Sequence, residues 1–285
     1  MANLKELRSR ITSVSSTMQI TSAMKMVSAA KLSRAQDAIT AMRPYSEKLT
    51  ELLQSLSANL DDISSKFGEQ REVKNVLIVA ISSNRGLAGA FNTNIVKGVR
   101  QLANNKYNGK NVEVFGLGKK ANDVLKKTLN ISGNNNAIYD DLNYDHVAEE
   151  AQKIMDWFLE GKYDEVVFVY NQFVNAATQI VTTEQFLPIQ KIEGEDAKQI
   201  DYISEPSQEE IVKDLIPKSL KMQLFKAMSD SLASEHGARM TAMHKATDNA
   251  TELRDALKLS YNKARQASIT NEILEIVGGA EALNN

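Results

Sequence analysis

The chain has 285 residues, 42 % of them hydrophobic, so it is long and apolar enough to bury a core and composition places it among the globular proteins. It has no cysteine, which excludes disulfides, thiolate zinc sites and cysteine nucleophiles. Its formal net charge is only −2, so no strong overall field points to nucleic acid as a partner.

Residues 1–70 are predicted to form a long N-terminal helix. Asn3 is a candidate cap with Glu6 three residues on, and apolar residues then recur at alternating three- and four-residue steps as far as Met18. The pattern slips in phase near Thr21, and we expect it to resume through Met24, Val27 and Lys31. Pro44 is expected to kink this helix without ending it.

The same helix is basic. Residues 1–48 contain eight lysines and arginines against three acidic residues. A basic helix indicates nucleic acid, an anionic membrane or an acidic protein surface as a partner, or simply a solvated face, and the sequence alone leaves these open.

Residues 71–207 have a different period and predict an α/β domain. Short apolar runs that suit buried strands alternate with amphipathic helices, which is typical of a Rossmann-like, mostly parallel sheet. The last strand reads as an antiparallel or edge strand that ends at Pro188, and residues 194–208 read as a polar connection. The expected strands are 74–82, 111–118, 130–133, 165–173 and 177–188, and the expected helices are 92–107, 119–128 and 145–160.

Residues 208–285 are predicted to be the C-terminal coiled-coil segment, in which Lys218–Asn285 forms one long helix with Pro217 in its first turn. About 60 residues of helix would span roughly 90 Å. We expect it to pair with the N-terminal helix as an antiparallel coiled coil. The expected seam is Leu224, Met228, Ser231, Ala242, Ala246, Ala250, Leu253, Leu257, Tyr261 and Ala264.

One loop is a candidate for chemistry. Ser82–Gly89 follows the first strand of the domain, at the edge where parallel sheets bind ligands. The loop lacks a phosphate-binding motif, so the favoured interpretation is a structural turn made by Gly86 and Gly89, with Asn92 or Thr93 capping the next helix. The glycines around Leu117 are interpreted in the same way.

A catalytic or metal site is not predicted. The only imidazoles are those of His146, His236 and His244, and the last two lie about two helical turns apart, too far for a chelating pair. We expect no cofactor and no metal, and a mechanical or interaction role rather than an enzyme.

Four separated segments resemble the gamma subunit of F-type ATP synthases. They are TMQITSAMKMVSAAK (17–31), SSNRGLAGAFN (82–92), YNKARQASIT (261–270) and the terminal ITNEILEIVGGAEA (269–282). The resemblance therefore covers both ends, the centre and the helix–α/β–helix order of the chain.

This resemblance implies the central rotor shaft of a proton-translocating ATP synthase, which couples proton flow to ATP synthesis or hydrolysis at the beta subunits. It implies one copy per complex, with an alpha and beta subunit hexamer, an epsilon subunit and a membrane c-ring as partners. By resemblance, Arg265 and Gln266 contact a beta-subunit loop, Met24 and Lys25 lie opposite the acidic beta lever arm, and the shaft tip comprises Ile269, Thr270, Glu272 and Glu275.

The resemblance also implies a peripheral position at the cytoplasmic face of a bacterial membrane. No secretory or transit segment is recognised at the start of the chain, and the longest apolar run, 76–81, is too short for a bilayer span. Two alternatives stay open: a coiled-coil scaffold or export protein, and a small-ligand α/β enzyme that uses the Ser82–Gly89 loop.

Overall fold

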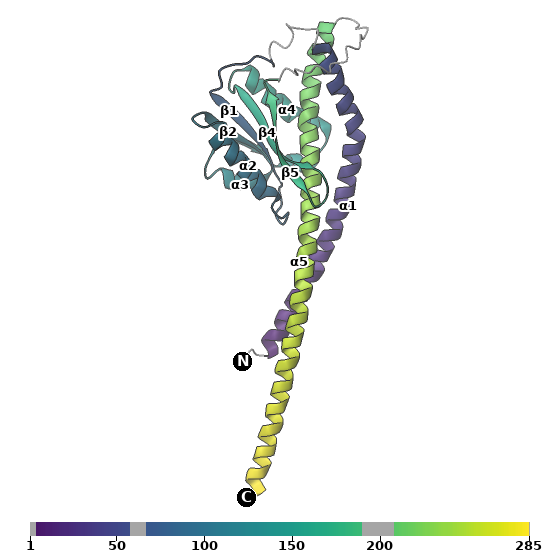
Figure 1. Cartoon of the computed structure of the whole chain (residues 1–285), viewed down its shortest axis with the longest axis vertical. Coiled ribbons are helices and arrows are strands. Elements are labelled where there is room, and N and C mark those ends of the chain that lie inside the picture. The colour runs from purple at the N-terminus through teal and green to yellow at the C-terminus, as the bar shows by residue number, and fades with distance from the viewer. Residues whose placement is uncertain (1–3, 58–66, 190–207, 285) are drawn as a thin grey trace. The chain divides into compact units, whose positions relative to one another are not determined.

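The computed structural model describes residues 4–57, 67–189 and 208–284 (Figure 1). Contacts divide the chain into two compact units, one of Met1–Ser28 with Met240–Asn285 and one of Ala29–Arg239. The elements are α1 (Leu4–Ser57), β1 (Asn75–Ile81), α2 (Phe91–Asn105), β2 (Asn111–Leu117), α3 (Lys119–Leu125), β3 (Asn130–Asn135), η1 (Ala137–Tyr139), α4 (Tyr144–Leu159), β4 (Glu165–Phe173), β5 (Gln179–Leu187) and α5 (Gln208–Asn284).

The larger unit contains a five-stranded sheet in the order β3-β2-β1-β4-β5. The first four strands are mutually parallel, and β5 returns antiparallel to β4 at the edge. Strand β1 lies at the centre, and its residues Val76–Ile81 are fully buried, as a continuous apolar run in a covered parallel sheet requires.

Each face of the sheet has its own core. On one face, strand side chains such as Val167 pack with Ile95 and Val99 of α2 and Leu125 of α3. On the other, strand side chains such as Phe168 pack with α4 and with the part of α5 that belongs to this unit. This second core includes Val147, Ile154, Phe158, Leu220, Leu224 and Met228.

In the smaller unit the terminal helices run antiparallel. Thr247 of α5 donates to the hydroxyl of Thr21, whereas Arg254, further along α5, reaches the sulfur of Met18, which precedes Thr21 in α1. The predicted fold class, an antiparallel helix pair with a mostly parallel α/β sheet, is confirmed.

The C-terminal helix starts earlier than predicted, whereas α2 starts within one residue of its predicted start at Asn92. Helix α5 begins at Gln208, and Pro217 lies inside it. The side chains on either side of the proline explain this: Ile216 and Leu220 pack against the sheet core. Their burial opposes the roughly 3 kcal/mol cost of an interior proline. Helix α2 begins at Phe91, after Ala90, which offers no side-chain cap.

The predicted polar connection at 194–208 lies almost entirely outside the described residues, as does the predicted domain boundary at 207. The division into 1–70, 71–207 and 208–285 therefore stays a prediction. Helix α1 continues through Pro44, as its apolar pattern indicated. In the described part of the chain, no helix combines the length and apolarity that a membrane crossing needs.

Candidate interaction surface

The seam of α5 in the smaller unit follows one unbroken heptad pattern. Side chains that are buried or half-buried recur at alternating three- and four-residue steps, namely at Met243, Thr247, Ala250, Arg254, Leu257, Tyr261, Ala264 and Ser268. Leu253, predicted to lie in the seam, is 52 % exposed, and the stem of Arg254 occupies that place instead. A long arginine stem can cover apolar surface while its guanidinium stays wet.

The predicted phase slip in α1 was also wrong. The pattern that begins at Leu4 continues through Thr21, Lys25 and Ser28, which are buried or half-buried, whereas Val27 is 58 % exposed. Polar residues occupy the seam positions here. The apolar periodicity of the sequence is therefore lost, although the heptad spacing of the buried positions continues. The hydroxyl of Thr21 is satisfied because it donates to the carbonyls of Thr17 and Met18 and accepts from Thr247.

Beyond Ser268, α5 has no described partner helix. The Thr21–Thr247 and Met18–Arg254 contacts place Leu4, the first described residue of α1, opposite residues 264–268, and Figure 1 shows α5 continuing past that point. Every described side chain after Ser268 is exposed. They include the large apolar residues Ile269, Ile273, Leu274, Ile276 and Val277. Several large apolar side chains left exposed close together on one helix are typical of a docking segment.

The predicted contact residues form two sites rather than one. Met24 and Lys25 are half-buried on α1, close to Thr21 and its bond to Thr247. Arg265 and Gln266 are exposed on α5, 18 residues past Thr247, a separation of about 27 Å along a helix. A partner that contacts both sites must therefore follow the helix pair over several turns.

The predicted tip residues are all exposed and lie on the single helix. The hydroxyl of Thr270 donates to the carbonyl of Gln266, and Ser268 donates to the carboxylate of Glu272 at 3.4 Å. These bonds are local to α5. The outward faces of Ile269 and Glu275 are left available to a partner.

The loop Ser82–Gly89 is held by its own hydrogen bonds. Ser83 donates from its backbone N–H to the side-chain oxygen of Asn92, and the hydroxyl of Ser82 accepts from the N–H of Ala121. Asn84 bridges Asn136 and Lys119. These groups are engaged within the protein, so the described geometry favours a structural role for the loop over a ligand site.

The turn within this loop depends on more than its glycines. Gly89 has φ 55°, and Leu87 has φ 62°, a left-handed conformation that is uncommon for a residue with a side chain. Leu87 is 64 % exposed, so the conformation is not imposed by burial of its own side chain. Asn92, predicted to cap α2, instead bonds Ser83 and ties the loop to the first turn of the helix.

A buried ionic cluster on α5 was missed by sequence reasoning. Glu235 and Arg239, one helical turn apart, form an ion pair of 2.7 Å with both side chains only 9 % exposed. The guanidinium of Arg239 also donates to the carbonyls of Arg85 and Gly86, which fastens the β1–α2 loop to α5. The i, i+4 spacing of Glu and Arg was the available signal, but it is equally common on solvated helix faces.

His236 belongs to the same cluster. Its ring Nδ1 lies 3.5 Å from Arg239. Burial, together with the positive charges of Arg239 and Lys31, lowers the pKa of His236 from 6.5 to about 4. Burial raises the pKa of Glu235, and Arg239 partly offsets that rise. Near neutral pH the ring of His236 is therefore uncharged. Its Nδ1 can accept a hydrogen bond from Arg239, and the two side chains do not repel each other.

A pH dependence of stability follows from this histidine. The folded pKa is depressed, so the unfolded chain takes up a proton below pH 6.5 while the folded chain does not until about pH 4. Stability should fall on acidification through that window, by about 1.4 kcal/mol per pH unit at most. The pKa of Glu235 is raised in the folded chain, so protonation of its carboxylate on acidification opposes this loss of stability. As the pH falls from 6.5 to 4.5, the thermal unfolding midpoint of the parent should fall more than that of His236→Gln. An equal fall of the two midpoints would contradict this.

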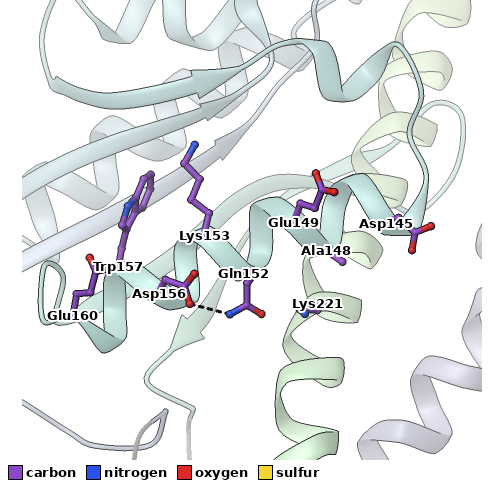
Figure 2. A pocket seen from close by; sticks show the side chains of 9 residues that line it. All are labelled: Asp145, Ala148, Glu149, Gln152, Lys153, Asp156, Trp157, Glu160 and Lys221. Atoms are coloured by element: carbon purple, nitrogen blue, oxygen red, sulfur yellow. Dashed lines mark hydrogen bonds between the residues drawn. The ribbon is translucent and has the colours of Figure 1, made fainter.

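A hollow of about 660 Å³ runs beside α4 (Figure 2). Its lining is Asp145, Ala148, Glu149, Gln152, Lys153, Asp156, Trp157, Glu160 and Lys221. Gln152 donates to Asp156 one turn along α4, and Lys153 lies over the rings of Phe115 and Trp157. Within the described residues no His, Cys, Asp and Glu group has the arrangement of a metal site. The carboxylates of its lining are all exposed to solvent, as on an ordinary charged helix face.

Comparison with known proteins gives a consistent assignment. The family described as ATP synthase matches residues 3–283. The ATP synthase gamma chain of Christiangramia forsetii is 74 % identical over 285 residues, covering 100 % of both chains, and that of Flavobacterium psychrophilum is 69 % identical, covering 99 % of both. A chain of the Euglena gracilis mitochondrial ATP synthase, in an OSCP/F1/c-ring structure, is 25 % identical with a TM-score of 0.70, covering 98 % of this chain and 94 % of that one.

These matches place the chain, with its helix pair and α/β sheet, in the class of non-catalytic subunits of ATP synthase complexes. The identity of 74 % refines this class, since that match covers the whole chain, both helices and the α/β sheet included. The chain belongs to the ATP synthase gamma chain family.

Proposed function

We propose that this chain is the central-stalk rotor of a proton-translocating F-type ATP synthase, and that its turning couples proton flow to ATP synthesis or hydrolysis on beta subunits. The observation that carries the proposal is the helix pair that continues into a single exposed helix, in a chain that matches gamma chains over its whole length. A packed helix pair whose backbone hydrogen bonds are internal is stiff enough to transmit torque. The exposed apolar end of α5 would be covered by the partner subunits that surround it.

The proposed partners are an alpha and beta subunit hexamer around the helix pair, an epsilon subunit and a membrane c-ring, with one copy of this chain per complex. The related chain from Euglena gracilis was solved with F1 and a c-ring, which supports membership of such a complex. The basic first segment suits an acidic beta-subunit surface near Met24 and Lys25. Each exposed ion pair would contribute up to about 1 kcal/mol, weak enough to exchange at every step. The proposed location is the cytoplasmic face of the membrane.

Reconstitution tests this function. Purified alpha and beta subunits should form a stable complex with one copy of this chain, and ATP hydrolysis by the mixture should rise when the chain is added. Absence of association, with a folded chain, would contradict the rotor proposal. Association with other proteins but not with the hexamer would instead favour a scaffold, and saturable nucleotide binding that depends on Ser82–Gly89 would favour an enzyme.

The proposed beta-subunit contact at Arg265 and Gln266 can be tested directly. Both side chains are exposed and lie outside the heptad seam, so Arg265→Ala with Gln266→Ala should leave the helix pair intact. Loss of polar groups at an interface centre typically costs about 2 kcal/mol, which would lower turnover or coupling about tenfold or more. ATP hydrolysis and ATP-driven proton pumping of the reassembled complex are the measurements.

The matched control is Lys263→Ala with Asn262→Ala, a neighbouring exposed pair that also carries one positive charge and one amide. The control complex should keep turnover and pumping within about twofold of the parent, as expected for surface positions without a partner. Equal losses in both variants would show that the segment acts through helix stability, and unchanged activity in both would contradict the contact.

A further inference from the structure

A basic hollow of about 500 Å³ lies at the opposite edge of the sheet from the Ser82–Gly89 loop. It is formed where the end of α2, the start of β2 and the turn between α3 and β3 meet. Its volume falls within the range of small-ligand sites. The lining is Ala103, Asn104, Tyr107, Asn108, Gly109, Lys110, Asn111, Val112, Lys126, Lys127, Thr128, Leu129 and Asn130.

The charges of this lining have one sign. Lys110, Lys126 and Lys127 contribute three positive charges, and the lining contains no carboxylate. Lys126 has Asp123 at 3.7 Å, a long and exposed pair. Among the residues that the structure describes, neither Lys110 nor Lys127 has a carboxylate at ion-pair distance, so both positive charges face solvent uncompensated.

Arg100 adds positive charge beside the hollow, and the carboxylate of Glu165 is already paired. Arg100 donates from one guanidinium nitrogen to the hydroxyl of Thr128, which lines the hollow, and its Nε is enclosed without a hydrogen-bond partner in the described structure. Glu165 is engaged by Lys106 at 2.7 Å and by the hydroxyl of Tyr107 at 2.6 Å. It therefore neutralises charge that lies outside the hollow.

The polar lining supplies donors rather than an apolar or aromatic wall. The side-chain amides of Asn104, Asn108 and Asn130 are at the surface, where each offers two N–H donors. Tyr107 is buried with its hydroxyl occupied, so no aromatic face of the lining is open for stacking a base. A ligand would be held by its anionic groups, because lysine acts as a point charge for phosphate oxygens.

We propose that this basic hollow binds a chain of phosphate groups, whether free oligophosphate or the phosphate tail of a nucleotide. Three lysines and several amide donors around about 500 Å³ match the charge density and size of such a chain, and a single phosphate would engage only part of the set. The site is separate from the helix surfaces on which the proposed rotor function depends.

Titration of the full-length chain with inorganic tripolyphosphate, at constant ionic strength because salt screens these charges, tests the proposal. Calorimetry should show saturable binding at one site. Lys126→Gln with Lys127→Gln should weaken it about tenfold or more, since two charge-assisted contacts are lost. Orthophosphate should bind more weakly than tripolyphosphate, and ATP should compete for the same site.

The control is Lys226→Gln with Lys245→Gln, which removes the same charge from two exposed lysines elsewhere. It should leave the affinity within about twofold, and both variants should keep the parent's thermal midpoint. Equal weakening in the two variants, or no saturable binding, would overturn the proposal. Binding of ATP without binding of tripolyphosphate would also overturn it. The proposal would also be overturned if the chain did not bind tripolyphosphate but bound phosphatidylglycerol vesicles through these lysines. That result would assign the surface to lipid.

Discussion

Arg239→Met should lower the free energy of unfolding of the chain by about 3–5 kcal/mol, the usual result of removing one partner of a buried ion pair. The carboxylate of Glu235 is 9 % exposed and loses the guanidinium 2.7 Å away. The carbonyls of Arg85 and Gly86 lose their donor as well, so the β1–α2 loop is released from α5. Urea unfolding followed by circular dichroism measures the change.

The double variant Glu235→Gln with Arg239→Met separates burial of a lone charge from loss of packing. Without the carboxylate no unpaired charge remains, so the double variant should recover most of the stability lost in Arg239→Met. Hydrogen exchange of the amides in Ser82–Phe91 should stay raised in both variants, since both lack the guanidinium. A double variant less stable than the single one would contradict this account.

Gly118→Ala should be comparably severe, at more than about 3 kcal/mol. Gly118 has φ 105° and ψ 153°, a backbone conformation that is essentially restricted to glycine. A methyl group there would meet the carbonyl oxygen of Ser82 at 2.2 Å, so the β1 and β2 ends would have to separate. The free energy of unfolding from urea titration is the measurement.

Gly109→Ala is the matched control for this position. Gly109 also has a positive φ, 79°, but no heavy atom lies within 4 Å of the place that its Cβ would take. Its substitution should cost only about 1 kcal/mol, the backbone term alone. Similar losses for the two variants would show that conformation, rather than the close approach to Ser82, makes Gly118 necessary.

Most of the α/β sheet could be predicted from the sequence because its strands are short apolar runs bounded by turns. Strand β1 illustrates this, since a short continuous run from Val76 to Ile81 is typical of a strand covered on both faces. The start of α5 could not be predicted, because Pro217 is a strong local signal for a first turn and its tolerance inside the helix depends on packing by Ile216 and Leu220.

The interaction surface was predictable only in part. The seam was misjudged where Thr21, Lys25 and Ser28 replace apolar residues, since hydropathy cannot show that a hydroxyl finds a partner across the helix pair. The Glu235–Arg239 cluster was missed because its burial depends on the β1–α2 loop, whose Arg85 lies 154 residues away in sequence. The roles of Arg265 and Gln266 rest on resemblance and stay predictions.

The exposed end of α5 bears on the order in which the complex is built. A free chain holds Ile269, Ile273, Leu274, Ile276 and Val277 in water, where such surfaces promote self-association. On the proposed arrangement this hazard lasts only until a hexamer encloses the helix. Early insertion of the chain during biogenesis, or temporary shielding of its last turns by a chaperone, would therefore shorten the time in which newly made copies can aggregate.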